Sequence, residues 1–305
     1  LEANPEKRHP ADFALWKRAG PEHIMRWPSP WGLGYPGWHI ECSAMAAKYL
    51  GLPFDIHGGG VDNKFPHHEA EIAQSEAAHN KEFARIWMHN GMVMIGGEEM
   101  HKSLGNFMTL RQAFERWSPL ALRFFIVGGH YRSPLDFSVE AMDAARRGLD
   151  RLVGAVRAVR EQLPRAPEGP ADDDVLALLE DHKARFLEAM NDDFNTAGAM
   201  GVLFELVRAT NSLVASPEPP TRETLEAVDR VYRELGGDVL GVVPETLAEE
   251  EVSALADELI DLLLATRQEL RAARQYGLAD RIRDRLSQMG IVLEDTPDGT
   301  RWRRG

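Results

Sequence analysis

The spacing of apolar residues changes at Ser138, and this change constrains the fold more than any other feature of the chain. Beyond it, Met142, Ala145, Leu149 and Val153 recur three or four positions apart, which is typical of an amphipathic helix. The same periodicity returns over about 175–190, 196–211, 221–235 and 247–276. The stretches PRAPEGPADDD and SPEPPT separate these segments and predict breaks between helices. The sequence therefore predicts a helical bundle in this part of the chain.

The residues before and after the helical segments have a different character. Up to about residue 95 the chain is rich in Gly, Trp, His and Pro, with short apolar runs at 52–56 and 92–95, which is typical of an α/β domain. The end of the chain, IVLEDTPDGTRW, has two β-rich runs around a Pro-Asp-Gly turn. We expect this segment to form a small hairpin.

Size and charge exclude several classes of protein. The chain has 305 residues, enough for two or three domains, and its 35 basic and 48 acidic residues give a net charge of −13, so it is not a general polyanion binder. No apolar run approaches the roughly 20 residues of a membrane-spanning helix. The start, LEANPEKRHPADF, lacks both a methionine and the pattern of a signal peptide, so we expect an N-terminally truncated piece of a longer product.

The single cysteine lies near residues that bind metals. One cysteine excludes an internal disulfide and fits a reducing, cytoplasmic compartment. His67 and Glu71 are four residues apart in PHHEAE, so they share one face if Pro66 opens a helix there. With Cys42 they would give zinc three ligands and one open position, as in a catalytic site. Two other interpretations stay open, a small buried thiol for Cys42 and a solvated His–Glu pair on an exposed helix. A zincin site is excluded because His68-Glu69 is not followed by a second histidine at Ile72.

Two further segments have features of a nucleotide site. The glycines 58–60 follow an apolar run and precede Asp62, which is typical of a strand end where backbone approaches a ligand and a carboxylate accepts bonds from ribose. A sharp turn needs the same glycines, so both interpretations stay open. In GGEEMHKSLGNF, Lys102 and Ser103 lie in a glycine-flanked loop where a lysine can reach polyphosphate. A plain surface lysine is the alternative.

The end of the chain concentrates positive charge on an acidic protein. From Arg267 onward there are nine arginines against six acidic residues. Arg301, Trp302, Arg303 and Arg304 combine charge with an aromatic surface that suits unpaired RNA bases. A solvated tail beside one core tryptophan is the alternative interpretation.

Taken together, these segments resemble cysteinyl-tRNA synthetase, a class I aminoacyl-tRNA synthetase family, over essentially the whole chain. The blocks that carry the resemblance occur in the family's order: DFALWK, SPWG, GWHIECSAM, HGGGVD, FPHHEAEIAQSEA, WMHNG, MHKSLGNF, LRFFIVGGHYRSPLDFS, MNDDFNTAGAMGVLFELVRATN and ADRIRDRL.

The resemblance implies a fold and a domain order. The fold is α/β and Rossmann-like, the C-terminal half of a class I synthetase catalytic fold, followed by an all-α helical bundle and a small C-terminal α+β element. The implied domains are the second half of the nucleotide-binding domain with the zinc site (1–95), a KMSKS-loop and stem-contact region (96–137), a DALR-type helical bundle (138–246) and an anticodon-binding region (247–305).

The resemblance also implies roles for individual residues. Cys42, His67 and Glu71 match three zinc ligands, while Trp38 and His57 match residues that bind the amino acid. Gly59, Gly60 and Asp62 match the adenylate-binding strand end. Lys102 matches the second lysine of the KMSKS loop, with Ser103 beside it, although Glu99 and His101 replace that loop's first lysine and serine.

The implied reaction is ATP-dependent activation of L-cysteine to cysteinyl adenylate and transfer to tRNA(Cys), with one zinc ion per chain selecting the thiol and Mg²⁺ accompanying ATP. The family's HIGH-like motif and a fourth, cysteine, zinc ligand lie in a first half that this sequence lacks. We therefore expect the chain alone to be inactive. The resemblance also implies a monomeric, cytoplasmic protein without membrane contact. Two alternatives stay open, the related cysteine ligase of mycothiol synthesis and a non-catalytic tRNA-binding relative.

Overall fold

The computed structural model describes residues 7–100, 105–289, 291–296 and 299–304. Over residues 248–258 and over most of the last two strands, it describes the backbone but not the side chains. The chain divides into two compact units. The first comprises Leu1–Met94 with Tyr131–Leu135, and the second comprises Ile95–His130 with Asp136–Gly305. We describe each unit by itself.

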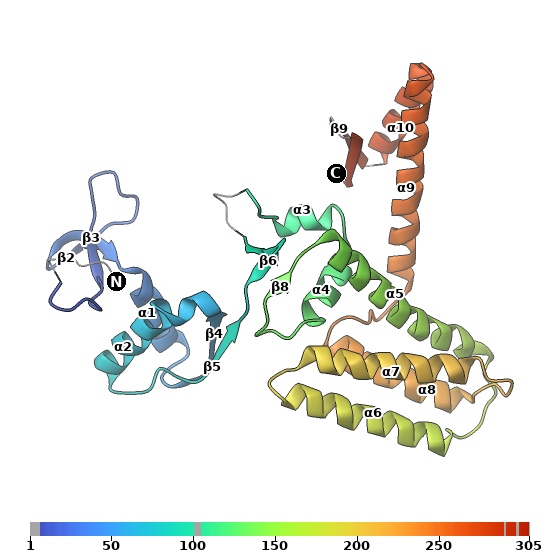
Figure 1. Cartoon of the computed structure of the whole chain (residues 1–305), viewed down its shortest axis with the longest axis horizontal. Coiled ribbons are helices and arrows are strands. Elements are labelled where there is room, and N and C mark those ends of the chain that lie inside the picture. The colour runs from blue at the N-terminus through green and yellow to red at the C-terminus, as the bar shows by residue number, and fades with distance from the viewer. Residues whose placement is uncertain (1–6, 101–104, 290, 297–298, 305) are drawn as a thin grey trace. The chain divides into compact units, whose positions relative to one another are not determined.

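The first unit combines short strands with two helices (Figure 1). A three-stranded antiparallel sheet has the order β1-β3-β2, and the strands β4 and β5 form a separate parallel pair. The elements are β1 (Trp16–Arg18), β2 (Trp27–Ser29), β3 (Gly32–Pro36), α1 (Trp38–Tyr49), β4 (Phe54–Gly60), the 3₁₀ helix η1 (Val61–Lys64), α2 (His67–His79) and β5 (Ala84–Asn90). Parallel pairing puts the carboxyl ends of β4 and β5 at one edge, where α/β folds bind ligands.

The segment that enters the second unit forms a third small sheet. Its strand order is β7-β6-β8, with β6 at Val93–Ile95, β7 at Glu98–Glu99 and β8 at Leu135–Asp136. The short helices α3 (Leu110–Phe114) and α4 (Pro119–Val127) follow β7. Each begins at a hydroxyl N-cap, Thr109 in α3 and Ser118 in α4, and Pro119 occupies the first helical turn of α4, as the local sequence favours.

The second unit contains the predicted bundle, which is confirmed. Its helices are α5 (Val139–Gln162), α6 (Asp173–Asn191), α7 (Thr196–Val214) and α8 (Arg222–Val231), and the π-helix η4 (Tyr232–Val239) extends α8. Ser138, Asp172, Asn195 and Thr221 accept backbone bonds as N-caps, so polar residues set each start.

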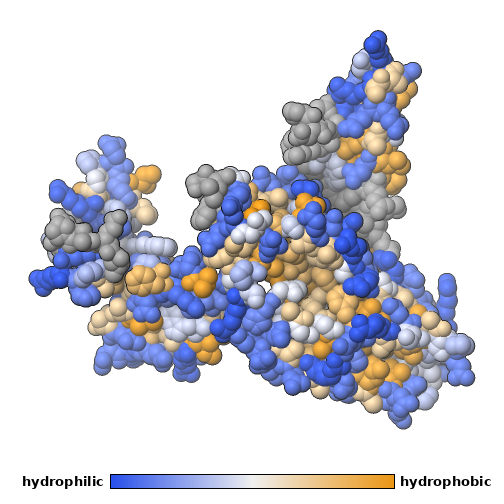
Figure 2. All heavy atoms as spheres, in the orientation of Figure 1, coloured by the Kyte–Doolittle hydropathy of each residue, from blue (hydrophilic) through white to orange (hydrophobic). Residues whose placement is uncertain are grey.

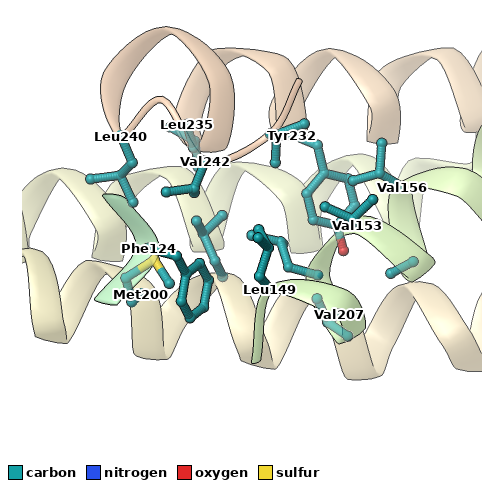
Figure 3. Close-up of a cluster of buried hydrophobic side chains, with 14 of the residues drawn as sticks. Phe124, Leu149, Val153, Val156, Met200, Val207, Tyr232, Leu235, Leu240 and Val242 are labelled. Atoms are coloured by element: carbon teal, nitrogen blue, oxygen red, sulfur yellow. The ribbon is translucent and has the colours of Figure 1, made fainter. Parts of the chain in front are cut away.

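Apolar side chains from α4, α5, α7 and η4 meet in the core of this bundle (Figure 3). Met142, Val156 and Phe186 are fully buried in it. Tyr232 is also buried, and its hydroxyl pairs with that of Thr210 at 2.9 Å, so both buried hydroxyl groups have a partner. Hydrophilic side chains are interspersed with small hydrophobic patches over the bundle surface drawn in Figure 2.

The C-terminal segment differs from the sequence prediction in one respect. A single helical segment was predicted over 247–276, but α9 (Ala248–Ala272) ends earlier and α10 (Tyr276–Gln288) follows it. Arg274 takes a left-handed conformation, φ +58°, at the break. Because no Gly or Pro marks that position, the pattern alone gave no stop signal. The predicted terminal hairpin is confirmed by β9 (Ile291–Thr296) and β10 (Gly299–Arg304), which pair in antiparallel register.

Among the residues that the structure describes, none of the helices combines the length and the hydrophobicity of a membrane-spanning segment.

Candidate functional site

The candidate metal site lies in the first unit, between α1, α2 and the parallel strands. Pro66 precedes α2 as its N-cap, so His67 and Glu71 lie one turn apart on one helix face. Glu71 is fully buried and His67 is 8% exposed. Cys42 comes from α1, and its sulfur, an imidazole nitrogen of His67 and a carboxylate oxygen of Glu71 all lie within 4.8 Å of one another.

One atom of this cluster lacks the partner that burial requires. Glu71 Oε2 lies 2.8 Å from His57 Nε2, whereas Oε1 faces His67 Nε2 at 3.4 Å and has no hydrogen-bond partner among the residues described. A buried carboxylate oxygen without a partner is costly, and a cation would satisfy it. Thiolate, imidazole and carboxylate are together the ligand types that zinc takes, so the three residues fit a zinc ion.

The electrostatics keep the thiol protonated in the absence of a metal. Burial, followed by the charge of Glu71, raises the pKa of the Cys42 thiol. A raised pKa argues against a redox-reactive thiolate at this position. A bound cation would displace the thiol proton, as metal binding to cysteine does generally.

Further histidines, which the sequence prediction did not assign, extend the cluster. His39 Nδ1 lies 2.9 Å from His67 Nδ1, and His68 Nδ1 lies 2.8 Å from His89 Nε2. Burial, followed by neighbouring His57 and His89, lowers the pKa of His68 to about 4, so this side chain is neutral at neutral pH. A signal existed for His39, which precedes Cys42 by three residues and therefore shares its helix face. His89 had no such signal, because only the β4–β5 register places it opposite Gly59.

A second set of possible ligands shares Glu71 with the first. Ligand atoms of His57, His68 and Glu71 also lie within 4.8 Å of one another. Here the His57 nitrogen already pairs with Glu71 Oε2, and His68 already pairs with His89. Because the oxygen without a hydrogen bond faces His67, a member of the first set, the first set is the better metal site.

The substrate-side residues predicted from the sequence lie around the same cluster. Trp38 begins α1, is 60% exposed, and its ring centroid lies 4.7 Å from that of His67. His57 lies on β4 and joins this strand to Glu71. The predicted binders of cysteine thus adjoin the candidate metal ligands.

The glycine-rich strand end is crowded by the protein itself. A Cβ at Gly59 would lie 3.0 Å from the His68 ring and 3.1 Å from the amide nitrogen of Asn63. Gly60 is followed by η1, whose exposed Asp62 carboxylate lies over it. Internal packing therefore explains part of the glycine requirement at this strand end, where the sequence left a ligand and a sharp turn as open interpretations.

Gly59→Ala is expected to lower the free energy of unfolding by about 1–3 kcal/mol, because the added methyl overpacks the contact with His68. Gly58→Ala is the matched control, since its Cβ would lie 3.4 Å from Met88 O and 3.9 Å from Met88 Cβ, both ordinary contacts. Urea unfolding of both variants checks this. Equal stability of the two would contradict the assigned crowding.

The remaining predicted site residues divide into two groups. Lys102 and Ser103 lie outside the described residues. Arg301, Arg303 and Arg304 lie on β10, where the structure describes only their backbone. Trp302 donates from Nε1 to Asp261 at 3.0 Å and packs against the cluster of Ile260, Leu264, Leu286 and Ile291. That contact favours the core-tryptophan interpretation of Trp302.

Family models match most of the chain in three segments. Residues 1–147 match the model for a tRNA synthetases class I (C) catalytic domain, residues 185–244 a DALR domain, and residues 256–303 a Cysteinyl-tRNA ligase anticodon binding domain.

Curated relatives match nearly the full chain. The cysteine–tRNA ligases of Deinococcus radiodurans and Thermus thermophilus are each 49% identical over 304 residues, covering 98% and 99% of this chain and 60% and 62% of those proteins. That of Pelobacter propionicus is 47% identical over 323 residues, covering 99% of this chain and 65% of the relative. The chain thus spans less than two thirds of the length of these relatives.

A solved structure shares the fold. LeuRS of Agrobacterium radiobacter K84, in a ternary complex with tRNA and LeuAMS, superposes with a TM-score of 0.53 at 16% identity, covering 74% of this chain and 36% of that one.

Proposed function

Because the chain belongs to the cysteinyl-tRNA synthetase family, we propose that it acts as a cysteine–tRNA ligase together with a segment equivalent to the rest of its relatives. In the proposed reaction, the carboxylate of L-cysteine attacks the α-phosphate of ATP and pyrophosphate leaves. The terminal ribose hydroxyl of tRNA(Cys) then attacks the cysteinyl carbonyl and AMP leaves. The observation that carries the proposal is the cluster of half-buried Cys42 with buried His67 and Glu71, in which one carboxylate oxygen has no hydrogen bond among the described residues.

One zinc ion per chain would be held by Cys42, His67 and Glu71. When bound with an open position, the ion supplies a soft acceptor for the substrate thiolate, for which a serine hydroxyl is a poor substitute. Trp38 would cover the bound side chain, and its exposed ring, which lies against His67, supports this role. His57 adjoins the same cluster and would contact the amino acid from the strand side.

ATP would bind at the carboxyl end of β4, with Mg²⁺ accompanying its phosphates. Gly59 and Gly60 would approach the adenylate, and Asp62 would accept hydrogen bonds from the ribose. Lys102 and Ser103 would contribute from the KMSKS-like loop, where a lysine stabilises the charge that develops on the leaving pyrophosphate. In this assignment residues 1–95 are catalytic and residues 96–137 contact the stem of the tRNA.

The second unit would bind tRNA(Cys). The DALR match over 185–244 and the anticodon-binding match over 256–303 support this role for the regions 138–246 and 247–305. The arginines at 301, 303 and 304 would contact the RNA backbone. The protein would act as a monomer in the cytoplasm. The anticodon-binding match favours a tRNA ligase over the cysteine ligase of mycothiol synthesis, and a metal-competent site is unexpected in a non-catalytic relative.

The proposal predicts cysteine-dependent exchange of pyrophosphate into ATP. The chain would be assayed after fusion to the preceding portion of the Thermus thermophilus relative, because the motifs expected there complete the ATP site. Exchange that requires cysteine supports the function. A folded, zinc-loaded fusion that shows no exchange would contradict it and leave tRNA binding as the activity to measure.

A further inference from the structure

Two histidines outside the proposed ligand set each occupy one atom of a ligand residue. His39 Nδ1 lies 2.9 Å from His67 Nδ1, and His57 Nε2 lies 2.8 Å from Glu71 Oε2. The two atoms left over, His67 Nε2 and Glu71 Oε1, face each other at 3.4 Å. Both histidines come from elements that flank α2, His39 from α1 and His57 from β4.

The contact between His39 and His67 determines which ring nitrogen of His67 carries the proton. A hydrogen bond between two Nδ1 atoms holds one proton, so one imidazole donates and the other accepts. If His67 binds an ion through Nε2, its own proton must reside on Nδ1, and His39 must accept with a bare Nδ1. His39 is 9% exposed and packs beside Trp38, with ring centroids 5.3 Å apart, so its ring is held in that position.

The second contact, between His57 and Glu71, distinguishes the two oxygens of the carboxylate. A proton on His57 Nε2 donates to Glu71 Oε2, which ties that oxygen to β4. Glu71 Oε1 then remains without a hydrogen bond among the described residues and faces His67 Nε2. Ligand residues in metal sites are commonly oriented by such outer hydrogen bonds.

We propose that His39 and His57 are positioning residues for the metal, and that the ligand atoms they leave free are His67 Nε2 and Glu71 Oε1. His39 fixes the tautomer of His67, and His57 fixes which carboxylate oxygen turns inward. This inference rests on the proposed zinc site, but it concerns residues outside the ligand set.

The test measures zinc affinity of the chain by competition with a chromophoric chelator. His39→Ala and His57→Ala are expected to bind zinc about 10- to 100-fold more weakly, the usual effect of removing an outer partner. His39→Asn restores an acceptor near the Nδ1 position and His57→Gln restores a donor near the Nε2 position, so both are expected to recover most of the affinity. The visible spectrum of the Co²⁺-loaded chain should change in the alanine variants and return in the amide variants.

His182→Ala is the matched control, because His182 is also a buried histidine, 7% exposed, and its Nδ1 pairs with Leu178 O within α6 of the second unit. It is expected to reduce stability and leave zinc affinity unchanged.

Four outcomes would overturn the inference. Alanine variants that bind zinc as tightly as wild type, with the same Co²⁺ spectrum, would refute it while leaving the zinc site standing. Affinity that is lost equally in the alanine and amide variants would show a packing role only. If zinc stays bound when Cys42 is replaced but is lost when His68 is replaced, the ion lies in the second ligand set. A wild-type chain that binds no zinc would refute both the proposed site and this inference.

Discussion

Cys42→Ser is expected to leave the purified chain without stoichiometric zinc, whereas the wild-type chain is expected to hold one ion. The substitution replaces a soft thiolate with a hydroxyl that zinc binds poorly, and it leaves only His67 and Glu71 as ligands. Loss of a direct ligand should exceed the roughly 10- to 100-fold effect of an outer partner. Metal analysis after gel filtration, with chelator competition for the affinity, measures the change.

Ser43→Ala is the matched control for this prediction. Ser43 is the next residue of α1, is 6% exposed and donates to Gln74 Oε1 at 2.7 Å, so its loss perturbs the same α1–α2 contact without removing a ligand. The control should keep its zinc. Equal zinc content in Cys42→Ser and wild type would contradict the assignment of Cys42.

The second large effect is expected in substrate discrimination. In the fused enzyme, kcat/KM for pyrophosphate exchange should favour cysteine over serine by about 10⁴ to 10⁵, because a binding group that the wrong substrate leaves unsatisfied discriminates far more than a methylene-sized difference. The Cys42→Ser fusion should lose most of that ratio through a lower rate with cysteine.

Both substrates must be measured on both proteins to make that comparison. A fall for cysteine alone supports thiol recognition at the metal. A variant that is free of zinc and still prefers cysteine by the wild-type ratio would show that another part of the pocket reads the thiol. Equal loss for both amino acids would indicate general damage to the adenylate site.

The sequence predicted the bundle well because local signals set its elements. Apolar residues three and four apart defined the faces of α5 to α8, and polar caps such as Asp172 and Asn195 defined their starts. The break at Arg274 was missed, since a left-handed arginine carries no local signal. The candidate ligands His67 and Glu71 were found for the same local reason, their spacing after Pro66.

The surroundings of the candidate site could not be predicted from spacing. The contact of His57 with Glu71 depends on how α2 packs against β4, and that of His68 with His89 depends on the register of β4 and β5. Likewise, the close contact between Gly59 and His68 arises from tertiary packing. Contacts between distant segments decided which oxygen of Glu71 is left unpartnered.

In the proposed function, the Cys42, His67 and Glu71 site binds a metal ion that accepts the substrate thiol. The most direct measurement is the absorption spectrum of the Co²⁺-loaded chain on titration with L-cysteine and, separately, with L-serine. Cysteine is expected to strengthen the thiolate-to-cobalt charge-transfer band, serine to leave it unchanged, and Cys42→Ser to abolish the response. A Co²⁺-loaded chain whose spectrum responds to neither amino acid, or equally to both, would contradict it.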